Sequence, residues 1–354
     1  MSEPVRIGVL GFAHGHVSTY CSEWNNSELG IQVVAGWDHD PARLRKAAET
    51  FGLQPYEDVT ALLDRDDIAA VVIASETSKH ADLAEQAAAA GKAIILQKPM
   101  ALTIREADRI VEAVRKHGVP FTMAWQMRAD PQNRQMKQWI DSGELGQLFM
   151  IRRRHGLAMG LQESFADSWH VQSEYNRDIW ADDAAHPIDL LYYWLGVPES
   201  VTAEIESLYN PRIPMNNGIA IFRYPGGPIA EVNCSFTCTA AENTTEIIAE
   251  RGTIVQNYGD ATSCNIARPG DGPGLKRFEA ATGVWTASDI ESPPNHGYRI
   301  RGLAQPLAEF VRGERPPLAT AEEGRTSLRL VLACYASSLQ GRRVTLDDPM
   351  IERL

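Results

Sequence analysis

A lysine stands at a point in the chain where a side chain could meet a bound ligand. Lys98 belongs to the tripeptide Gln97-Lys98-Pro99, which directly follows the apolar run of residues 93–96. Such a run is typical of a buried parallel strand, and ligands of open α/β sheets gather at the carboxyl ends of these strands. Pro99 favours extended backbone at Lys98 and prevents simple helical continuation. An ammonium group there can polarise a reacting oxygen, although a surface lysine that ends a strand is the simpler interpretation.

Asp182 and His186 have the residue types and the spacing of an acid/base pair. A separation of four residues puts both on one face of a helix, which Asp189 and Tyr193 continue. Because Pro187 belongs near the start of a helix, Asp182 is expected in its first turn. The carboxylate would orient the imidazole, and histidine is well suited to take a hydroxyl proton near neutral pH. The alternative is a helix cap beside a buried structural histidine.

A glycine-containing turn follows the first apolar segment, residues 6–10. A dinucleotide-binding fold needs a tight turn here, so that backbone amides and a helix N-terminus meet the pyrophosphate. The strict pattern Gly-x-Gly-x-x-Gly would begin at Gly11, but its second and third glycines are replaced by Ala13 and His16. Gly15 comes one place early, and a turn without a ligand is the alternative. The candidate phosphate-binding residues are Gly11, Phe12, Ala13, His14 and His16.

An acidic residue ends the second apolar segment. The carboxylate of Asp38 stands where it can bond both ribose hydroxyls of adenosine and repel a 2′-phosphate. No arginine follows immediately, since the next residues are His39 and Asp40. The sequence therefore predicts NAD as the cofactor, with NADP disfavoured. The alternative is that Asp38 only caps a turn, a role that Asp40 could share.

The elements that would position these residues alternate between strand and helix in the first third of the chain. One helix has complete end signals, with Asp40 as N-cap, Pro41 at its first position and Gly52 as C-cap. Strands separated by helices of this length predict a doubly wound parallel sheet. The expected strands are residues 6–10, 32–37, 69–74, 93–96 and 119–124, and the expected helices are residues 41–51, 80–90 and 103–116.

The second half of the chain has strand signals with turns between them. Pro225-Gly226-Gly227-Pro228 is a hairpin-type turn. The succession predicts an open, largely antiparallel sheet with helices on one side. A long loop is expected over residues 270–294, which are rich in Gly, Pro and Asp, and a helix over residues 320–340. The expected strands are residues 148–155, 200–205, 219–224, 229–236, 245–249 and 252–255.

Composition and charge exclude several classes of protein. The 354 residues suggest two domains at roughly 150 residues each. The net charge of -12 argues against nucleic-acid binding. Five widely spread cysteines without a metal-type set indicate reduced thiols and no metal centre. No signal-type segment or membrane-spanning apolar run is present in the sequence, so a cytoplasmic protein that does not bind membranes is expected.

Four stretches together resemble the Gfo/Idh/MocA oxidoreductase family, which includes glucose–fructose oxidoreductases and inositol dehydrogenases. They are the glycine turn with Asp38, residues 73–80, Gln97-Lys98-Pro99 (similar to the family's Glu-Lys-Pro) and residues 182–189 (similar to its Asp-x-x-x-His-x-x-Asp). The resemblance implies an N-terminal Rossmann domain with a doubly wound parallel sheet over residues 1–125. It also implies a C-terminal α+β domain over residues 126–354, which binds substrate and carries a large, mostly antiparallel sheet. The outer face of that sheet often makes the oligomer contact, so a homodimer or homotetramer is expected.

The resemblance implies an NAD-dependent dehydrogenase that moves a hydride between the cofactor and a hydroxyl-bearing carbon. The substrate, bound between the domains, would be a sugar, an amino sugar or a polyol such as inositol. The implied catalytic residues are Lys98, Asp182 and His186. The cofactor contacts implied beyond the glycine turn and Asp38 are Ser75, Glu76, Thr77, His80, Gln97 and Lys98. The candidate substrate contacts, chosen by position and polarity, are Lys98, Gln126, Arg154, Trp169, His170, Asp182, His186, Asp189 and His296.

Two departures from the family pattern keep other functions open. Gln97 replaces the motif's glutamate and removes a negative charge beside Lys98. The glycine-rich segment that often precedes the family's Asp-x-x-x-His is replaced by residues 174–180, so no specific substrate carries over. One alternative is an NAD-dependent glycoside hydrolase or lyase that uses a transient oxidation. Another is a non-catalytic regulator that senses NAD or a sugar.

Overall fold

The computed structural model of the protein describes residues 3–26, 28–240, 243–257 and 274–354. The chain divides into two compact units, each built from three segments. The first unit contains residues 1–126, 174–176 and 300–328, and the second contains residues 127–173, 177–299 and 329–354. The first unit thus includes two segments, residues 174–176 and 300–328, that lie beyond residue 125.

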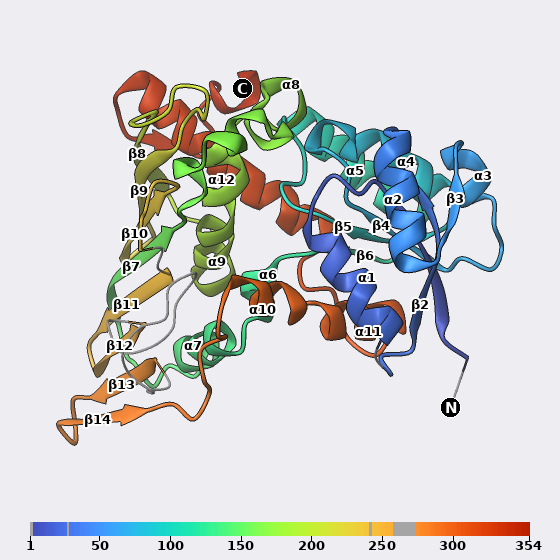
Figure 1. The fold of residues 1–354 in the computed structure, drawn as a ribbon. Helices are drawn as coiled ribbons and strands as arrows, with labels where there is room; N and C mark the ends of the chain where they lie inside the picture. The colour runs from blue at the N-terminus through green and yellow to red at the C-terminus, as the bar shows by residue number, and fades with distance from the viewer. Residues whose placement is uncertain (1–2, 27, 241–242, 258–273) are drawn as a thin grey trace. The chain divides into compact units, whose positions relative to one another are not determined.

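The first unit contains a parallel sheet with the strand order β3-β2-β1-β4-β5-β6 among its described residues (Figure 1). The order runs outward from β1 in both directions, which confirms the expected doubly wound sheet. In such sheets ligands bind where the order reverses, outside the carboxyl ends of the strands. The strands are β1 (Val5–Leu10), β2 (Ile31–Trp37), β3 (Gln54–Tyr56), β4 (Ala70–Ile73), β5 (Ala93–Leu96) and β6 (Phe121–Met123).

Burial and end signals explain why these segments form strands and helices. All four residues of β4 are buried, as expected for a central strand covered on both faces. Asp40 caps α2 by accepting hydrogen bonds from two backbone amides, and Gly52 ends that helix with a φ of 67°. Thr103 and Glu106 form a capping box at the start of α5. The helices here are α1 (His16–Asn26), α2 (Pro41–Phe51), α3 (Val59–Leu63), η1 (Thr77–Lys79), α4 (His80–Ala89) and α5 (Ile104–His117).

Residues 300–328 belong to the first unit because they bond to its helices and strands. The indole of Trp24 in α1 donates a 2.8 Å hydrogen bond to the carbonyl of Ala304, the first residue of α11 (Ala304–Val311). The amide of Met123, the last residue of β6, donates to the carbonyl of Ala319 at 3.0 Å. This late segment therefore completes the unit that begins at the N-terminus.

In the described part of the second unit, the sheet has the order β14-β13-β12-β11-β7-β10-β9-β8-β15. Neighbouring strands there are antiparallel except β7 and β10, which confirms a large, mostly antiparallel sheet. Helix α9 (Ala185–Leu195) contacts β7 and β10. The strands are β7 (Leu148–Gly156), β8 (Ser200–Glu206), β9 (Asn217–Arg223), β10 (Ile229–Ser235), β11 (Asn243–Ala249), β12 (Gly252–Gln256), β13 (Leu275–Glu279), β14 (Val284–Ala287) and β15 (Val344–Thr345).

The expected loop over residues 270–294 is wrong where the chain forms β13 and β14. β13 and β14 pair as an antiparallel hairpin there, and residues 270–273 lie outside the described residues. Because β14 is an edge strand with all four residues exposed, it lacks the apolar alternation by which a strand is recognised. The remaining elements are α6 (Gln126–Ala129), α7 (Pro131–Asp141), η2 (Met159–Leu161), η3 (Glu163–Asp167), η4 (Trp169–Val171), α8 (Ser173–Asn176), η5 (Trp180–Ala184), α10 (His296–Arg301), α12 (Ala321–Gln340) and η6 (Ile351–Arg353).

Two further expectations concern cysteines and membranes. The four cysteines that the structure describes (Cys21, Cys234, Cys238 and Cys334) form no disulfide, and Cys264 lies outside the described residues. None of the helices in the described ranges combines the length and the apolar character needed to cross a membrane.

Candidate active site

The glycine turn is packed closely against the segment that follows β4. Gly11 has a φ of 90°, and a Cβ built on it would lie 2.5 Å from the Cα of Ser75, so only glycine fits. The amides of Gly11 and His14 donate to the carbonyls of Trp37 (2.7 Å) and Ala74 (2.9 Å). The turn is thus fixed between the ends of β2 and β4, and α1 begins directly after it. A turn of this kind that leads into a helix N-terminus can receive a pyrophosphate.

Asp38 connects the glycine turn to the end of β2. The backbone amide of Phe12 donates to Asp38 Oδ2 at 2.7 Å, and the amide of Asp40 donates to Oδ1 at 2.8 Å. The carboxylate is buried and also accepts hydrogen bonds from the guanidinium of Arg43. Arg43 comes five residues after Asp38, from the first turn of α2. Arg43 thus stands outside the immediate neighbours of Asp38, on which the prediction of NAD rests.

The segment after β4 is buried and tied to the segment after β5. His80 lies between backbone carbonyls, with Nδ1 2.9 Å from the oxygen of Pro99 and Nε2 3.2 Å from that of Ser75. Burial lowers the pKa of His80 to about 4, so its ring is neutral at neutral pH. The hydroxyl of Thr77 donates to Asn176 Oδ1 at 2.6 Å. Because a neutral ring carries a single N–H, His80 donates to one of these carbonyls and lies against the other, so it packs between two loops of the predicted cofactor site.

Lys98 and its neighbours lie at the carboxyl end of β5, where the sequence predicts them. Lys98 is 3% exposed, and a cis peptide bond joins it to Pro99. The side-chain amide nitrogen of Gln97, Nε2, donates to the hydroxyl of Tyr20 in α1 at 2.8 Å. Gln126 is also buried, and both polar atoms of its side chain lack a hydrogen-bond partner among the described residues. A buried amide of this kind can be satisfied by a bound ligand.

In the second unit, a π-helical turn precedes the helix that carries His186. The turn is η5, and α9 starts at Ala185, so Asp182 stands just before the α-helix rather than in its first turn. Pro187 is the third residue of α9 and has no amide hydrogen to donate into the preceding turn. The regular α-helical hydrogen bonds are therefore interrupted at Pro187. Single π-helical turns of this kind are frequent at functional sites.

Asp182 contacts an aromatic cluster that includes two other predicted substrate contacts, Trp169 and His170. Asp182 Oδ2 lies 3.1 Å from Nδ1 of His170. The His170 ring stacks on Trp169 with ring centroids 3.9 Å apart, and Phe165 stacks on it at 5.8 Å. The structure thus brings together three of the predicted substrate contacts, Trp169, His170 and Asp182.

A second histidine near His186 was not predicted. His155 is completely buried on β7, and its ring centroid lies 6.0 Å from that of His186. Its Nε2 lies 3.1 Å from Oδ2 of Asp183. This is a close histidine–carboxylate contact without the geometry of a hydrogen bond. The available signal was the alternation along β7, which buries residues 151, 153 and 155.

The other predicted substrate contacts lie elsewhere in the second unit. Asp189 is completely buried, and Arg128 donates to both of its carboxylate oxygens at 2.9 Å. Arg154 is exposed on the face of β7 opposite to His155, and its guanidinium lies 3.2 Å from the sulfur of Cys238. His296 is half-buried at the start of α10. These positions do not add support to a substrate role for Asp189, Arg154 or His296.

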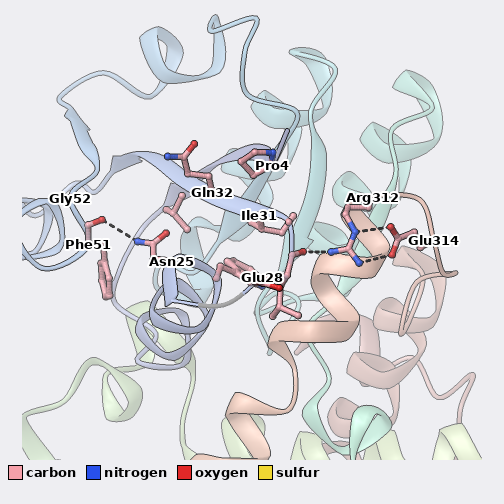
Figure 2. A pocket seen from close by; sticks show the side chains of 13 residues that line it. Pro4, Asn25, Glu28, Ile31, Gln32, Phe51, Gly52, Arg312 and Glu314 are labelled. Atoms are coloured by element: carbon pink, nitrogen blue, oxygen red, sulfur yellow. Dashed lines mark hydrogen bonds and ion pairs between the residues drawn. The ribbon is translucent and has the colours of Figure 1, made fainter. Parts of the chain in front are cut away.

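A cavity of about 820 Å³ in the first unit lies away from these residues. Figure 2 shows its lining, which includes Pro4 just before β1, Gln32 near the start of β2, and Arg312 and Glu314 after α11. It therefore lies at the amino ends of β1 and β2. Lys98 and Asp38 lie at the carboxyl ends of their strands, so this cavity is not the predicted cofactor site.

Two family models match the chain. Residues 5–125 match an oxidoreductase family model with an NAD-binding Rossmann fold, and residues 133–255 match the GFO/IDH/MocA C-terminal domain. D-apiose dehydrogenase of Paraburkholderia graminis is 24% identical over 97% of this chain and 89% of its own length. The NAD(+)-type scyllo-inositol 2-dehydrogenase of Bacillus subtilis is 26% identical over 98% of both.

The fold is also similar to that of solved structures. WlbA dehydrogenase from Bordetella pertussis, in complex with NADH and UDP-GlcNAcA, has a TM-score of 0.80 and 22% identity over 98% of each chain. Both halves of the sequence, and the two sheets that they form, thus lead to one conclusion. The chain belongs to the Gfo/Idh/MocA family of oxidoreductases with an NAD-binding Rossmann fold.

Proposed function

We propose that this protein is an NAD-dependent dehydrogenase of a sugar, an amino sugar or a polyol. Family membership supports the class of reaction, and the printed names of the apiose and inositol relatives support this class of substrate. The observation that carries the proposal is the contact between Asp38 and the glycine turn in the first unit. The carboxylate proposed to bind the ribose and the turn proposed to bind the phosphates are joined there by one hydrogen bond.

The residues of the first unit fit a dinucleotide. The glycine turn from Gly11 to His16, which leads into the N-terminus of α1, would hold the pyrophosphate. Asp38 would bond the adenosine ribose, and Ser75, Glu76 and Thr77 would line the cofactor. The unsatisfied side chain of Gln126 would bond to the nicotinamide half or to the substrate. NAD supplies the hydride acceptor when it is bound.

His186 is the proposed general base for substrate oxidation. Its imidazole would take the proton of the reacting hydroxyl and return it in the reverse reaction, a role worth about 10²–10⁴-fold in rate. The ammonium group of Lys98 would stabilise the developing alkoxide. Asp182, in contact with His170, is proposed to orient the catalytic groups. Trp169 and His170 would contact the substrate, and the remaining candidates Arg154, Asp189 and His296 stay predictions.

The proposal extends to the assembly and the compartment. Exposed apolar side chains on the open face of the second unit's sheet, such as Ile219 and Ile221 of β9, would form the contact of a homodimer or homotetramer.

The described cysteines form no disulfide, and this supports a cytoplasmic location.

The direct test is to incubate the purified protein with NAD and a panel of sugars, amino sugars and polyols. We expect NADH to accumulate with at least one of them in proportion to substrate consumed. Cleavage of a glycoside without net NADH would support the hydrolase or lyase alternative instead. NAD binding without any turnover over the whole panel would support a regulator.

A further inference from the structure

Two buried carboxylates share one guanidinium just beyond the end of β2. Arg43 Nη2 lies 2.9 Å from Asp38 Oδ1 and 2.7 Å from Glu76 Oε1, and its Nε lies 3.2 Å from Asp38 Oδ2. The side chains of Asp38 and Glu76 are 1% and 4% exposed, whereas that of Arg43 is 27% exposed. Glu76 comes from the segment after β4, so the guanidinium joins the ends of two strands.

The guanidinium of Arg43 is already paired with two carboxylates, so it can contribute little to the binding of another anion. Burial alone would lower the pKa of Arg43, but its hydrogen bonds with Asp38 and Glu76 raise it overall, so the guanidinium stays charged. One positive charge thus faces two buried negative charges. His39 lies beside both, with Nε2 3.4 Å from Glu76 Oε2, and Asp40 adds an exposed carboxylate nearby.

The two nicotinamide cofactors make different demands on this cluster. The 2′-hydroxyl of NAD needs only an acceptor, which Asp38 supplies. The 2′-phosphate of NADP adds a charge of about −1.5 to −2 and needs a cation, for which arginine is the usual partner. If Arg43 turned to a phosphate, Glu76 or Asp38 would be left as a buried carboxylate without its partner, which is strongly unfavourable.

We infer that Glu76 sets the preference for NAD over NADP by holding Arg43 in its pair with Asp38. Glu76 is in this sense a positioning residue that acts through Arg43, while Asp38 makes the ribose contact itself. The inference rests on the proposed function, because it requires the dinucleotide to bind with its adenosine ribose at Asp38.

The test is calorimetric titration of cofactor-free protein with NAD and, separately, with NADP. In Glu76→Gln we expect the ratio of NADP affinity to NAD affinity to rise about tenfold or more above the wild-type ratio. In Glu76→Gln combined with Arg43→Gln, the gain in NADP affinity should disappear, because the cation that would serve the phosphate is absent. Glu76→Asp, which keeps the charge but shortens the side chain, should raise NADP affinity by a smaller factor.

Asp40→Asn is the matched control. It also removes one negative charge close to Asp38, and asparagine preserves the cap of α2 because it is an equally good N-cap residue. We expect its ratio of NADP to NAD affinity to stay within about twofold of the wild-type ratio.

Several results would overturn the inference. An unchanged ratio of NADP to NAD affinity in Glu76→Gln, an equal gain in Asp40→Asn, or a gain that persists without Arg43 would each show that Glu76 does not act through the guanidinium. A wild-type protein that binds NADP more tightly than NAD would refute the inference and leave the dehydrogenase proposal intact. A wild-type protein that binds neither nucleotide would refute both.

Discussion

Gly11 is the residue of the predicted cofactor site that tolerates the fewest substitutions. Its positive φ disfavours any other side chain, and the backbone of Ser75 occupies the place that a Cβ would take. Gly15, four residues later, has open space where its Cβ would be. Only the first of these two glycines is required by the geometry of the turn.

We predict that Gly11→Ala lowers NAD affinity by about tenfold or more and destabilises the protein by about 1–3 kcal/mol, because it strains the backbone and displaces Ser75. Titration with NAD and thermal unfolding with and without NAD measure the two effects. Gly15→Ala is the control for stability, which should stay nearly unchanged because a methyl group there meets open space. Equal effects of the two substitutions would contradict the role given to Gly11.

Sequence prediction at the residue scale succeeded where a role depends on neighbours along the chain. The N-cap of Asp40 and the C-cap of Gly52 follow from local hydrogen bonding and backbone preference, and both are confirmed. Arg43 stands only five residues from Asp38, but its second partner Glu76 and the partner of His155, Asp183, are distant in sequence, so neither cluster was predicted. No local pattern records such a contact.

At the scale of elements, the π-helical turn η5 is the least regular part of the proposed catalytic machinery. It carries Asp182 and Asp183 directly before α9, where Pro187 interrupts amide donation. The four-residue spacing of Asp182 and His186 predicted a shared helical face, but it could not predict that the helix changes type between them.

We predict that Pro187→Ala lowers kcat by about ten- to a hundredfold, because a restored amide lets α-helix extend backward and shifts the acidic side chains. NAD binding should be unchanged, since the cofactor residues belong to the first unit. Pro306→Ala is the control and should leave kcat unchanged. Pro306 is likewise the third residue of its helix, α11, but it does not follow a π-helical turn. Steady-state kinetics with the substrate found by the panel measure the effect. An unchanged kcat in Pro187→Ala would show that the turn does not depend on the proline.

The two loops joined by His80 give stability a defined dependence on pH. The pKa of His80 falls from 6.5 to about 4 on folding, because burial disfavours its charged form. The stability that its neutral ring contributes is fully present above pH 6.5 and is lost as the pH falls toward 4. Asp178 acts in the opposite sense, since burial raises its pKa from 3.8 to about 6.

We therefore predict that the stability advantage of the wild type over His80→Gln shrinks by about 3 kcal/mol as the pH falls from 6.5 to 4. Taking the difference between the two proteins cancels the contribution of Asp178, which both contain. Denaturant unfolding at a series of pH values gives this difference. A difference that stays constant with pH would mean that His80 is not neutral and buried in the folded protein.

At the scale of the whole molecule, each compact unit is assembled from segments that are far apart in sequence. Residues 300–328 belong to the first unit through bonds such as that between Trp24 and Ala304. The sequence predicted both sheets, because strand and helix periodicity are local properties. It could not predict which sheet a late helical segment would join, since that depends on tertiary packing.

We predict that Ile221→Glu on the open face of the large sheet converts the proposed homo-oligomer to monomers. Ile221 is exposed and lies opposite Glu231 and Thr202 in the strand register, so a second glutamate would add repulsion as well as remove apolar contact. Light scattering after size-exclusion chromatography measures the mass. Leu339→Glu, at an exposed leucine of α12, should leave the mass unchanged. A monomeric wild-type protein would contradict the proposed assembly.

The measurement that tests the central claim most directly is a comparison of wild type and His186→Ala, in which NADH formation and NAD binding are followed on the same preparations. We predict that the wild type forms NADH with at least one sugar or polyol. In His186→Ala, turnover should fall by about 10²–10⁴-fold while NAD affinity stays the same. An unchanged turnover in His186→Ala, or a wild type that binds NAD but oxidises none of these substrates, would contradict the account.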